Sequence, residues 1–170
     1  CFAYTGGFAV NALQGGAKSV TLVEDSRDAL TLAKKNIELN SFSADKAQFI
    51  DGDAFQVLRR FRDEARQFDM VILDPPNFAV AHGKIPGALR GYKDINLLGI
   101  KLLKPGGILA TFCCSGMIDG PTFRWNIFSA LQDAGRSAQV LALTGHGADH
   151  PWLINFPEGE YLKGFCLRIV

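Results

Sequence analysis

The chain has 170 residues, of which 48% are hydrophobic and 21% charged, and its formal net charge is +1. This length and composition indicate one domain with a sizeable core and exclude a disordered chain. No apolar run approaches a membrane span, no signal-peptide pattern opens the sequence, and no global positive field would attract nucleic acid.

Strand-like and helix-like segments alternate along the chain. Apolar runs predict strands at residues 1–4, 19–24, 47–50, 68–73, 108–114, 139–143 and 160–170. Helical spacing of apolar residues predicts helices at 8–14, 27–39, 54–66, 92–103 and 123–134. Because there is no initiator methionine and the first strand reads as already under way, we expect a fragment that begins inside that strand.

Strands that alternate with helices pair in parallel and build a doubly wound sheet. The last two predicted strands have no helix between them, so they should pair antiparallel across a long loop at 145–159. We therefore predict an α/β, Rossmann-like fold. Its sheet is mostly parallel and seven-stranded, with an antiparallel terminal strand and helices on both faces.

Glycines and acids follow the predicted strands at one edge of the sheet. Gly6-Gly7 in the first turn allows a ligand to approach backbone amides at a helix N-terminus. Glu24 ends the second strand roughly 20 residues later, where a carboxylate binds ribose hydroxyls, and Asp53 follows the third. Each acid alone is better explained as a cap or turn residue, but acids at consecutive strand ends, with Asp74 as a further one, favour a binding site. A nicotinamide dehydrogenase would use the same elements, but the full G-x-G-x-x-G is missing here.

The fourth strand ends in Asp74-Pro75-Pro76-Asn77-Phe78. Two prolines restrict the backbone to a rigid corner, which would point carbonyls and the Asp74 carboxylate into the crevice beyond the strand ends. An ordinary strand-to-loop turn is the alternative.

Several stretches together carry a family resemblance. They are residues 2–10 (FAYTGGFAV), 74–78 (DPPNF), 90–96 (RGYKDIN), 111–116 (TFCCSG), 148–151 (ADHP) and 157–165 (PEGEYLKGF). In this order they resemble the class I S-adenosylmethionine (SAM)-dependent methyltransferase domain of the bacterial 23S ribosomal RNA (cytosine-C5) methyltransferase I family. Residues 1–170 would be that catalytic domain, without the family's N-terminal PUA-type and connecting domains.

The resemblance implies where the cofactor SAM binds. It assigns cofactor contacts to the first turn, the ribose to Glu24, the adenine to Asp53, and both methyl donor and target base to Asp74. Tyr4 stands where other methyltransferases carry the first glycine of the loop. The residues of the first turn are Tyr4, Thr5, Gly6 and Gly7.

The four cysteines lack the paired spacing of a zinc site, so we expect no metal, and they indicate a reducing, cytoplasmic setting. Cys114 matches the family's nucleophile, which adds to cytosine C6 so that C5 can attack a methyl group. Side chains alternate along a strand, so Cys113 should face the core instead, and Cys166 in the last strand should also be core. The motif 74–78 lacks the second cysteine of many related enzymes, which leaves the base for product release open.

RNA would have to present its target base unstacked. The residues that we expect to contact it are Pro75, Pro76, Phe78, Arg90, Lys93 and His150. Lys84 and Arg90 lie in an irregular stretch, for which we expect a mobile lid; each charge can equally be a solvated surface group. His150 is a candidate base or a loop-packing histidine.

Two further functions remain open at this point. An amino- or ring-nitrogen RNA methyltransferase would use the acid and prolines but has no use for a thiol. A catalytically inactive RNA-binding module would keep the fold alone. The expected partners are ribosomal RNA and, in the full-length protein, a second copy as a homodimer, with no membrane.

Overall fold

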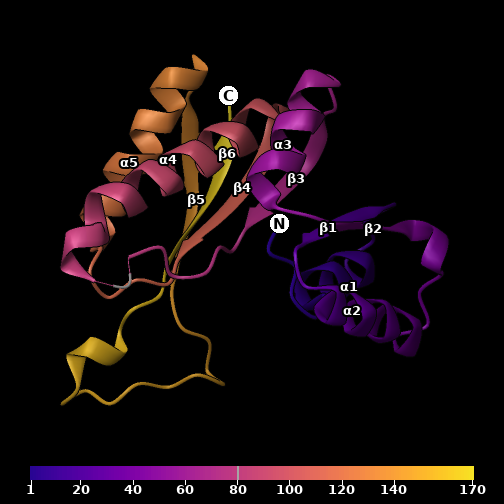
Figure 1. Cartoon of the computed structure of the whole chain (residues 1–170), viewed down its shortest axis with the longest axis horizontal. Helices are drawn as coiled ribbons and strands as arrows, with labels where there is room; N and C mark the ends of the chain where they lie inside the picture. Colours follow the sequence, from indigo (N-terminus) through magenta and orange to yellow (C-terminus); the bar gives the residue numbers. More distant parts are fainter. Residues whose placement is uncertain (80) are drawn as a thin grey trace. The chain divides into compact units, whose positions relative to one another are not determined.

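The computed structural model describes residues 1–79 and 81–170, which divide into two compact units, Cys1–Val57 and Leu58–Val170 (Figure 1). The first unit contains a two-stranded parallel sheet, and the second a four-stranded mixed sheet. No helix within these described ranges is long and apolar enough to cross a membrane.

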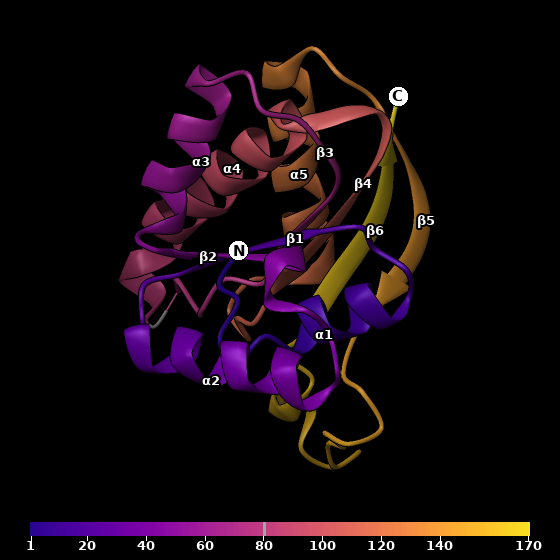
Figure 2. The same cartoon turned by 90° about the vertical axis from the view of Figure 1, so that its right-hand side faces the viewer.

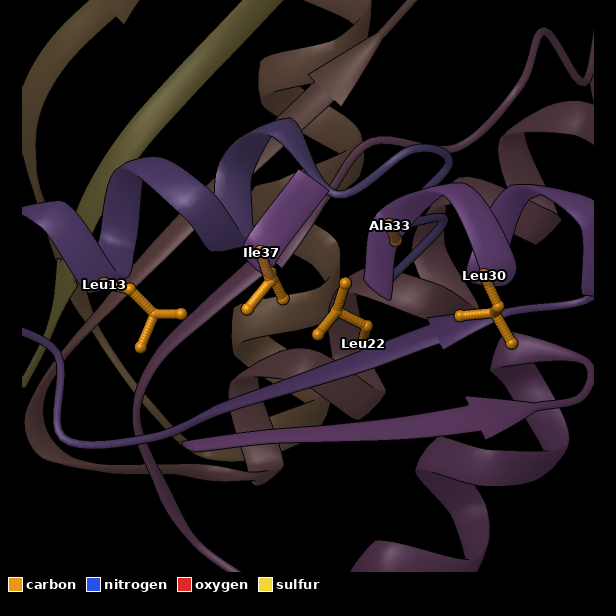
Figure 3. Packing of buried hydrophobic residues seen from close by; sticks show 5 residues of the cluster. All are labelled: Leu13, Leu22, Leu30, Ala33 and Ile37. Carbon is orange, nitrogen blue, oxygen red and sulfur yellow. The ribbon is translucent and has the colours of Figure 1, made fainter. Parts of the chain in front are cut away.

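The first unit packs two helices on its small sheet. Its elements are α1 (Gly7–Gln14), β1 (Val20–Glu24), α2 (Arg27–Leu39), the 3-10 turn η1 (Ala44–Lys46) and β2 (Ala47–Asp51). The core lies between the helices and the strands, where Figure 3 shows the side chains of Leu13, Leu22, Leu30, Ala33 and Ile37.

Local signals explain why α2 begins where it does. The Ser26 hydroxyl accepts a hydrogen bond from the Ala29 amide (3.3 Å), which caps the first turn of the helix. Ala29, Leu30, Ala33 and Ile37, which recur at helical spacing, then bury one face of the helix. The helix 27–39 predicted from the sequence is confirmed with the same bounds.

The second unit places α4 and α5 side by side on one face of its sheet (Figures 1 and 2). After α3 (Ala54–Asp63), which begins in the first unit, its elements are β3 (Phe68–Leu73), η2 (His82–Lys84), α4 (Ile85–Lys101), β4 (Leu103–Cys113), α5 (Gly120–Ala134), β5 (Ala138–Thr144), η3 (Pro157–Gly159) and β6 (Lys163–Ile169). The strand order is β3-β4-β6-β5. β3 and β4 are parallel, whereas β6 runs antiparallel to both β4 and β5. The predicted antiparallel terminal pair is therefore confirmed.

Aromatic side chains join the layers of the second unit. The Tyr92 ring of α4 lies 4.7 Å from the Phe78 ring and 5.5 Å from the Phe123 ring of α5. Phe123 in turn lies 5.9 Å from Phe165 of β6. Tyr92 and Phe123 are completely buried, so this chain of rings ties the segment after β3 to both helices and the sheet.

The predicted seven-stranded sheet is wrong in this structure. Residues 1–4 form no strand, because Phe2 and Tyr4 have φ angles of 59° and 46°, outside the extended region. The Ala3 amide still donates to the Val23 carbonyl (3.1 Å), but one such bond does not make a ladder. Without that strand, the hydrogen-bonded strands fall into separate sheets of two and four.

The predicted lid after Phe78 is also wrong for much of its length. Arg90 lies within α4, which begins at Ile85 rather than at the predicted residue 92, and Lys84 ends the short turn η2. Pro86 is in the first turn of α4, where its fixed φ and missing amide hydrogen favour the helix instead of breaking it. Residue 80 of the predicted lid lies outside the described residues.

Candidate active site

The turn Thr5-Gly6-Gly7 lies close against α2 in the first unit. Gly6 adopts a left-handed conformation (φ 82°), and a Cβ built on it would lie 3.0 Å from the Ala33 Cβ. The Asn36 side chain of α2 donates to the Thr5 carbonyl (2.8 Å). The turn is thereby held in a shape that only glycine accommodates without strain, and it leads directly into the N-terminus of α1.

Glu24 connects this turn to the end of β1. One carboxylate oxygen accepts from the Tyr4 amide (2.8 Å), and the other accepts from the Ser26 amide (3.1 Å). Each oxygen keeps a further lone pair, so the carboxylate can still accept from hydroxyl groups of a ligand.

Asp53 lies at the same edge of the two-stranded sheet. The Gly52 amide donates to the Glu24 carbonyl (3.0 Å), which continues the pairing of β1 and β2 and brings the two acids to neighbouring strand ends. Asp53 also accepts from the Gln56 amide (2.9 Å) and so caps α3. Asp53 is exposed, and its second carboxylate oxygen can accept a further hydrogen bond.

These groups fit SAM chemically. A helix N-terminus with a glycine turn offers amide donors to a carboxylate, and acids at successive strand ends offer acceptors to ribose hydroxyls and to an adenine amine. The structure brings together the predicted cofactor-binding residues Tyr4 to Gly7, Glu24 and Asp53 within the first unit.

In the second unit, Cys114 and Asp74 meet at the ends of two neighbouring parallel strands, β4 and β3. The Cys114 thiol donates to a carboxylate oxygen of Asp74, with 3.9 Å between Sγ and Oδ1. Both residues are half-buried. A thiol and an acid are thus in contact, although they are 40 residues apart in the sequence.

The surroundings disfavour charge on both groups. Burial raises the pKa of the Asp74 carboxyl above its usual range, and the hydrogen bond from Cys114 partly opposes that effect. Burial, together with the charges of Asp74 and Cys113, raises the pKa of the Cys114 thiol to about 11. The positive charge of Lys163 acts in the opposite direction on this thiol.

Cys113 faces the core, as strand alternation predicts: its side chain is completely buried beside Tyr92. Burial and then the contact with Cys113 raise the pKa of the Tyr92 phenol above its usual range. Cys166, also predicted as core, is only partly buried in β6. All four cysteines are free thiols.

Lys163 is a residue of this site to which sequence reasoning assigned no role. It begins β6, opposite Cys113 in the antiparallel register, and its ammonium group donates to the Ser115 carbonyl. Burial lowers the pKa of this ammonium group. No local sequence signal points to it, because pairing of β6 with β4 in the assembled sheet is what places Lys163 beside the two cysteines.

The motif 74–78 forms a corner supported by its own side chains. The Asn77 side chain accepts from the Ala79 amide (2.8 Å) and closes a tight turn. Phe78 packs on Tyr92 and on Gly91, where an added Cβ would lie 3.3 Å from the Phe78 ring. Pro75 is buried and Pro76 exposed. Phe78 therefore has a structural contact that its predicted role in substrate binding did not include.

The other predicted RNA contacts lie in different surroundings. Lys93 forms an ion pair with Asp133 (2.8 Å) that links α4 to α5, whereas Arg90 is exposed on α4. His150 lies in the loop between β5 and β6, where its Nε2 lies 2.7 Å from the Tyr161 hydroxyl oxygen. This contact supports the loop-packing alternative for His150.

His146 is a second histidine of that loop, which sequence reasoning missed. Its Nε2 accepts from the amides of Tyr161 and Leu162 (3.2 and 3.1 Å), and its ring stacks on that of His150. Across residues 1–79 and 81–170, no group of three or more His, Cys, Asp or Glu side chains could hold a metal ion.

Comparisons with known proteins define the class. The family of S-adenosylmethionine-dependent methyltransferases matches residues 1–154, and the chain belongs to that family. SAM is accordingly its cofactor.

The chain is 48% identical over 170 residues to the ribosomal RNA large subunit methyltransferase I of Klebsiella pneumoniae (strain 342), covering 100% of this chain and 42% of that protein. It is 49% identical over its whole length to the protein of the same name from Salmonella arizonae, again covering 42% of it. The chain thus spans less than half the length of these curated relatives.

A provisionally named methyltransferase solved in complex with SAH has the same fold. Its TM-score is 0.85 at 22% sequence identity, with 98% of this chain and 43% of that chain covered. The α/β fold of a class I SAM-dependent methyltransferase is therefore shown by both the family and the structural match.

Proposed function

We propose that this chain is a catalytic domain that methylates C5 of a cytosine in large-subunit (23S) ribosomal RNA through a covalent adduct of Cys114. The observation that carries the proposal is the pair Cys114–Asp74, with a thiol 3.9 Å from an acid at the ends of neighbouring strands. The substrate class is supported by the name of the relatives at 48% identity.

Asp74 would carry a proton from the Cys114 thiol to the target base. Cytosine C6 accepts a nucleophile more readily when N3 takes up a proton, and a half-buried carboxyl group whose pKa is raised can supply that proton. The same carboxyl group would hold the N3/N4 edge of the base and stabilise the charge that develops there.

The Cys114 thiol would pass its proton to the Asp74 carboxylate that it contacts, and the resulting thiolate would donate an electron pair to C6 and form the S–C6 bond. The electrons of the C5=C6 bond then move into a C4=C5 bond, and those of C4=N3 move to N3, which takes the proton from Asp74. SAM would supply the electrophilic methyl group; C5 would bond to it with the C4=C5 electron pair, the N3 lone pair would re-form C4=N3, and the sulfur of SAM would keep the electrons of its broken bond. Loss of the C5 proton to a base then re-forms C5=C6 and expels the thiolate, while N3 returns its proton to Asp74.

In the first unit, Glu24 and Asp53 would hold the ribose and the adenine of the cofactor, and the turn at Tyr4 to Gly7 would contact its amino-acid end. The paired acceptors at neighbouring strand ends support these roles. Pro75, Pro76, Phe78 and the basic residues Arg90 and Lys93 would contact RNA.

An amino- or ring-nitrogen methyltransferase is the second candidate, because an acid followed by two prolines also suits attack by a nitrogen. The thiol next to Asp74 favours C5 chemistry, which requires a nucleophile on the protein. An inactive RNA-binding module would need neither group. With four free thiols, we expect a reducing cytoplasmic location, where the full-length protein can act as a homodimer.

The test is methylation of protein-free large-subunit RNA with labelled SAM, followed by nucleoside analysis. The wild type should form 5-methylcytosine, and Cys114→Ser should lose at least about 10³-fold in rate while it still binds SAM. Cys113→Ala is the matched control, because it removes the neighbouring thiol from the core without touching the Cys114–Asp74 pair. Formation of 5-methylcytosine by Cys114→Ser at the wild-type rate would rule out the mechanism.

A second measurement uses RNA that contains 5-fluorocytosine. Fluorine at C5 cannot leave as a proton does, so the adduct should persist, and mass spectrometry should find it on the peptide that contains Cys114. Methylation at a nitrogen without any adduct would favour the second candidate instead.

A further inference from the structure

Within the proposed mechanism, the Cys114 thiol must ionise in surroundings that oppose it. Asp74 and Cys113 both disfavour a negative charge on its sulfur, and so does burial. Catalytic cysteines usually have the opposite environment, with a cation or a helix N-terminus beside the thiol. A source of positive charge is therefore needed near Cys114.

The groups that face this thiol come from four segments. Asp74 follows β3, Cys113 ends β4, Tyr92 lies on α4, and Lys163 begins β6. Of these groups, Lys163 is the cation. The remaining three bear no charge or a negative one, so none of them can favour a thiolate.

The backbone and its own hydrogen bond hold Lys163 in place. The antiparallel register pairs it with Cys113, the residue just before Cys114. Its ammonium group donates to the carbonyl of Ser115, the residue just after Cys114. The lysine therefore reaches across the strand end and binds the backbone that carries the thiol.

The Ser115 carbonyl that Lys163 contacts lies in buried surroundings. Ser115 is completely buried, and its hydroxyl accepts from the Met117 amide (3.2 Å), so the carbonyl to which Lys163 donates belongs to an ordered turn. Two carboxylates also act on the ammonium group, Asp119 at the N-terminus of α5 and the exposed Glu160. Asp119 also caps α5 by accepting from the Thr122 amide (2.8 Å).

We propose that Lys163 is the positioning residue of the nucleophile: bound to the Ser115 carbonyl, its ammonium group orients the turn after β4 and supplies the positive charge that stabilises the Cys114 thiolate. It acts through Cys114 and makes no bond to the substrate. The inference rests on the proposed role of Cys114, yet its electrostatic part can be measured without RNA or SAM.

The test is the pH dependence of alkylation of Cys114 by iodoacetamide, with peptide mapping to separate it from the other three cysteines. Only the thiolate reacts, so the rate reports its population. Replacing Lys163 by methionine removes the charge and keeps a similar length. Because a cation favours the thiolate, its loss should raise the apparent pKa and slow alkylation about tenfold at a fixed pH below it, which is one pKa unit.

Two variants make the result specific. Lys163→Arg keeps the charge and should keep a rate near that of the wild type. Lys104→Met removes a lysine that pairs with Asp69 (2.7 Å) at the opposite end of β4, and it should leave the profile unchanged. Circular dichroism of each variant shows whether the fold is retained.

The outcomes separate this inference from the proposed function. An unchanged alkylation profile in a folded Lys163→Met variant would overturn the inference, even if the protein methylates C5. The same slowing in Lys104→Met would also overturn it, because any lysine would then have the effect. A shift confined to Lys163→Met would support it even if RNA methylation were absent, in which case only the proposed function would fail.

Discussion

The two units differ in the sequence separation of the hydrogen bonds that hold their polar side chains. In the first unit, Glu24 accepts from Ser26, two residues away, and from Tyr4, 20 residues away. In the second, the Cys114–Asp74 and Lys163–Ser115 contacts join residues 40 and 48 positions apart. The proposed cofactor-binding groups thus depend largely on one turn and two strands, whereas the position of the Cys114 thiol depends on the strand order of the mixed sheet.

The electrostatic character of the units differs as well. Glu24 and Asp53 accept hydrogen bonds from backbone amides, as carboxylates at strand and helix ends commonly do. Asp74 and Cys114 instead share a half-buried place in which burial disfavours the charge on each. Side chains with shifted pKa values are found more often at catalytic sites than at sites that only bind a ligand.

The largest effect should come from the second unit. Asp74→Asn keeps the shape of the side chain but cannot donate a carboxyl proton, so methylation should slow by about 10²- to 10³-fold. Removing the negative charge should at the same time lower the pKa of Cys114, so alkylation of that thiol should become faster. Measuring both rates in this variant tests whether methylation becomes slower while alkylation of Cys114 becomes faster.

Asp69→Asn is the control for that substitution, since it removes an exposed carboxylate at the start of the same strand. Asp69→Asn should alter neither the methylation rate nor the rate of Cys114 alkylation. If Asp74→Asn methylated RNA as fast as the wild type, Asp74 would have no catalytic role. The proposed division, with catalytic groups in the second unit and cofactor-binding groups in the first, would then be wrong.

A smaller effect is expected in the first unit, on stability. Gly6→Ala places a Cβ 3.0 Å from that of Ala33 at a residue with φ 82°, and it should reduce the free energy of unfolding by about 2–3 kcal/mol. Gly7→Ala is the matched control, because nothing lies within 4 Å of its Cβ position and the residue is already helical. Urea unfolding followed by circular dichroism measures both.

Equal stability of Gly6→Ala and Gly7→Ala would contradict the close approach of the turn to α2. In that case the first unit would hold its cofactor-binding turn less rigidly than the structure indicates.

The smallest effect should be on cofactor affinity. Glu24→Gln exchanges one acceptor oxygen for an amide NH2 group, which cannot accept from a backbone amide, so either the Tyr4 or the Ser26 amide loses its acceptor and the dissociation constant for SAM should rise about tenfold. Glu38→Gln, an exposed residue of α2, serves as the control. Titration calorimetry gives both constants, and an unchanged value for Glu24→Gln would remove Glu24 from the proposed ribose site.

Sequence patterns predicted the elements whose signals are local. The bounds of α2 follow from a capping serine and apolar residues at helical spacing, and the burial of Cys113 follows from strand alternation. The start of α4 was missed because Pro86 and Gly87 read as a loop, although a proline is accommodated in the first turn of a helix. A first strand was wrongly predicted at residues 1–4, because residue type there does not reveal the positive φ angles of Phe2 and Tyr4.

By itself, the sequence determined the alternation of strands and helices, the acids at the strand ends and the order of the methyltransferase motifs, because each depends on residues close together in the chain. Only the tertiary structure decided that the thiol of Cys114 lies beside Asp74 and that Lys163 binds the backbone next to it. Those contacts arise from the pairing of β4 with both β3 and β6, and strand register is a property of the assembled sheet rather than of any single segment.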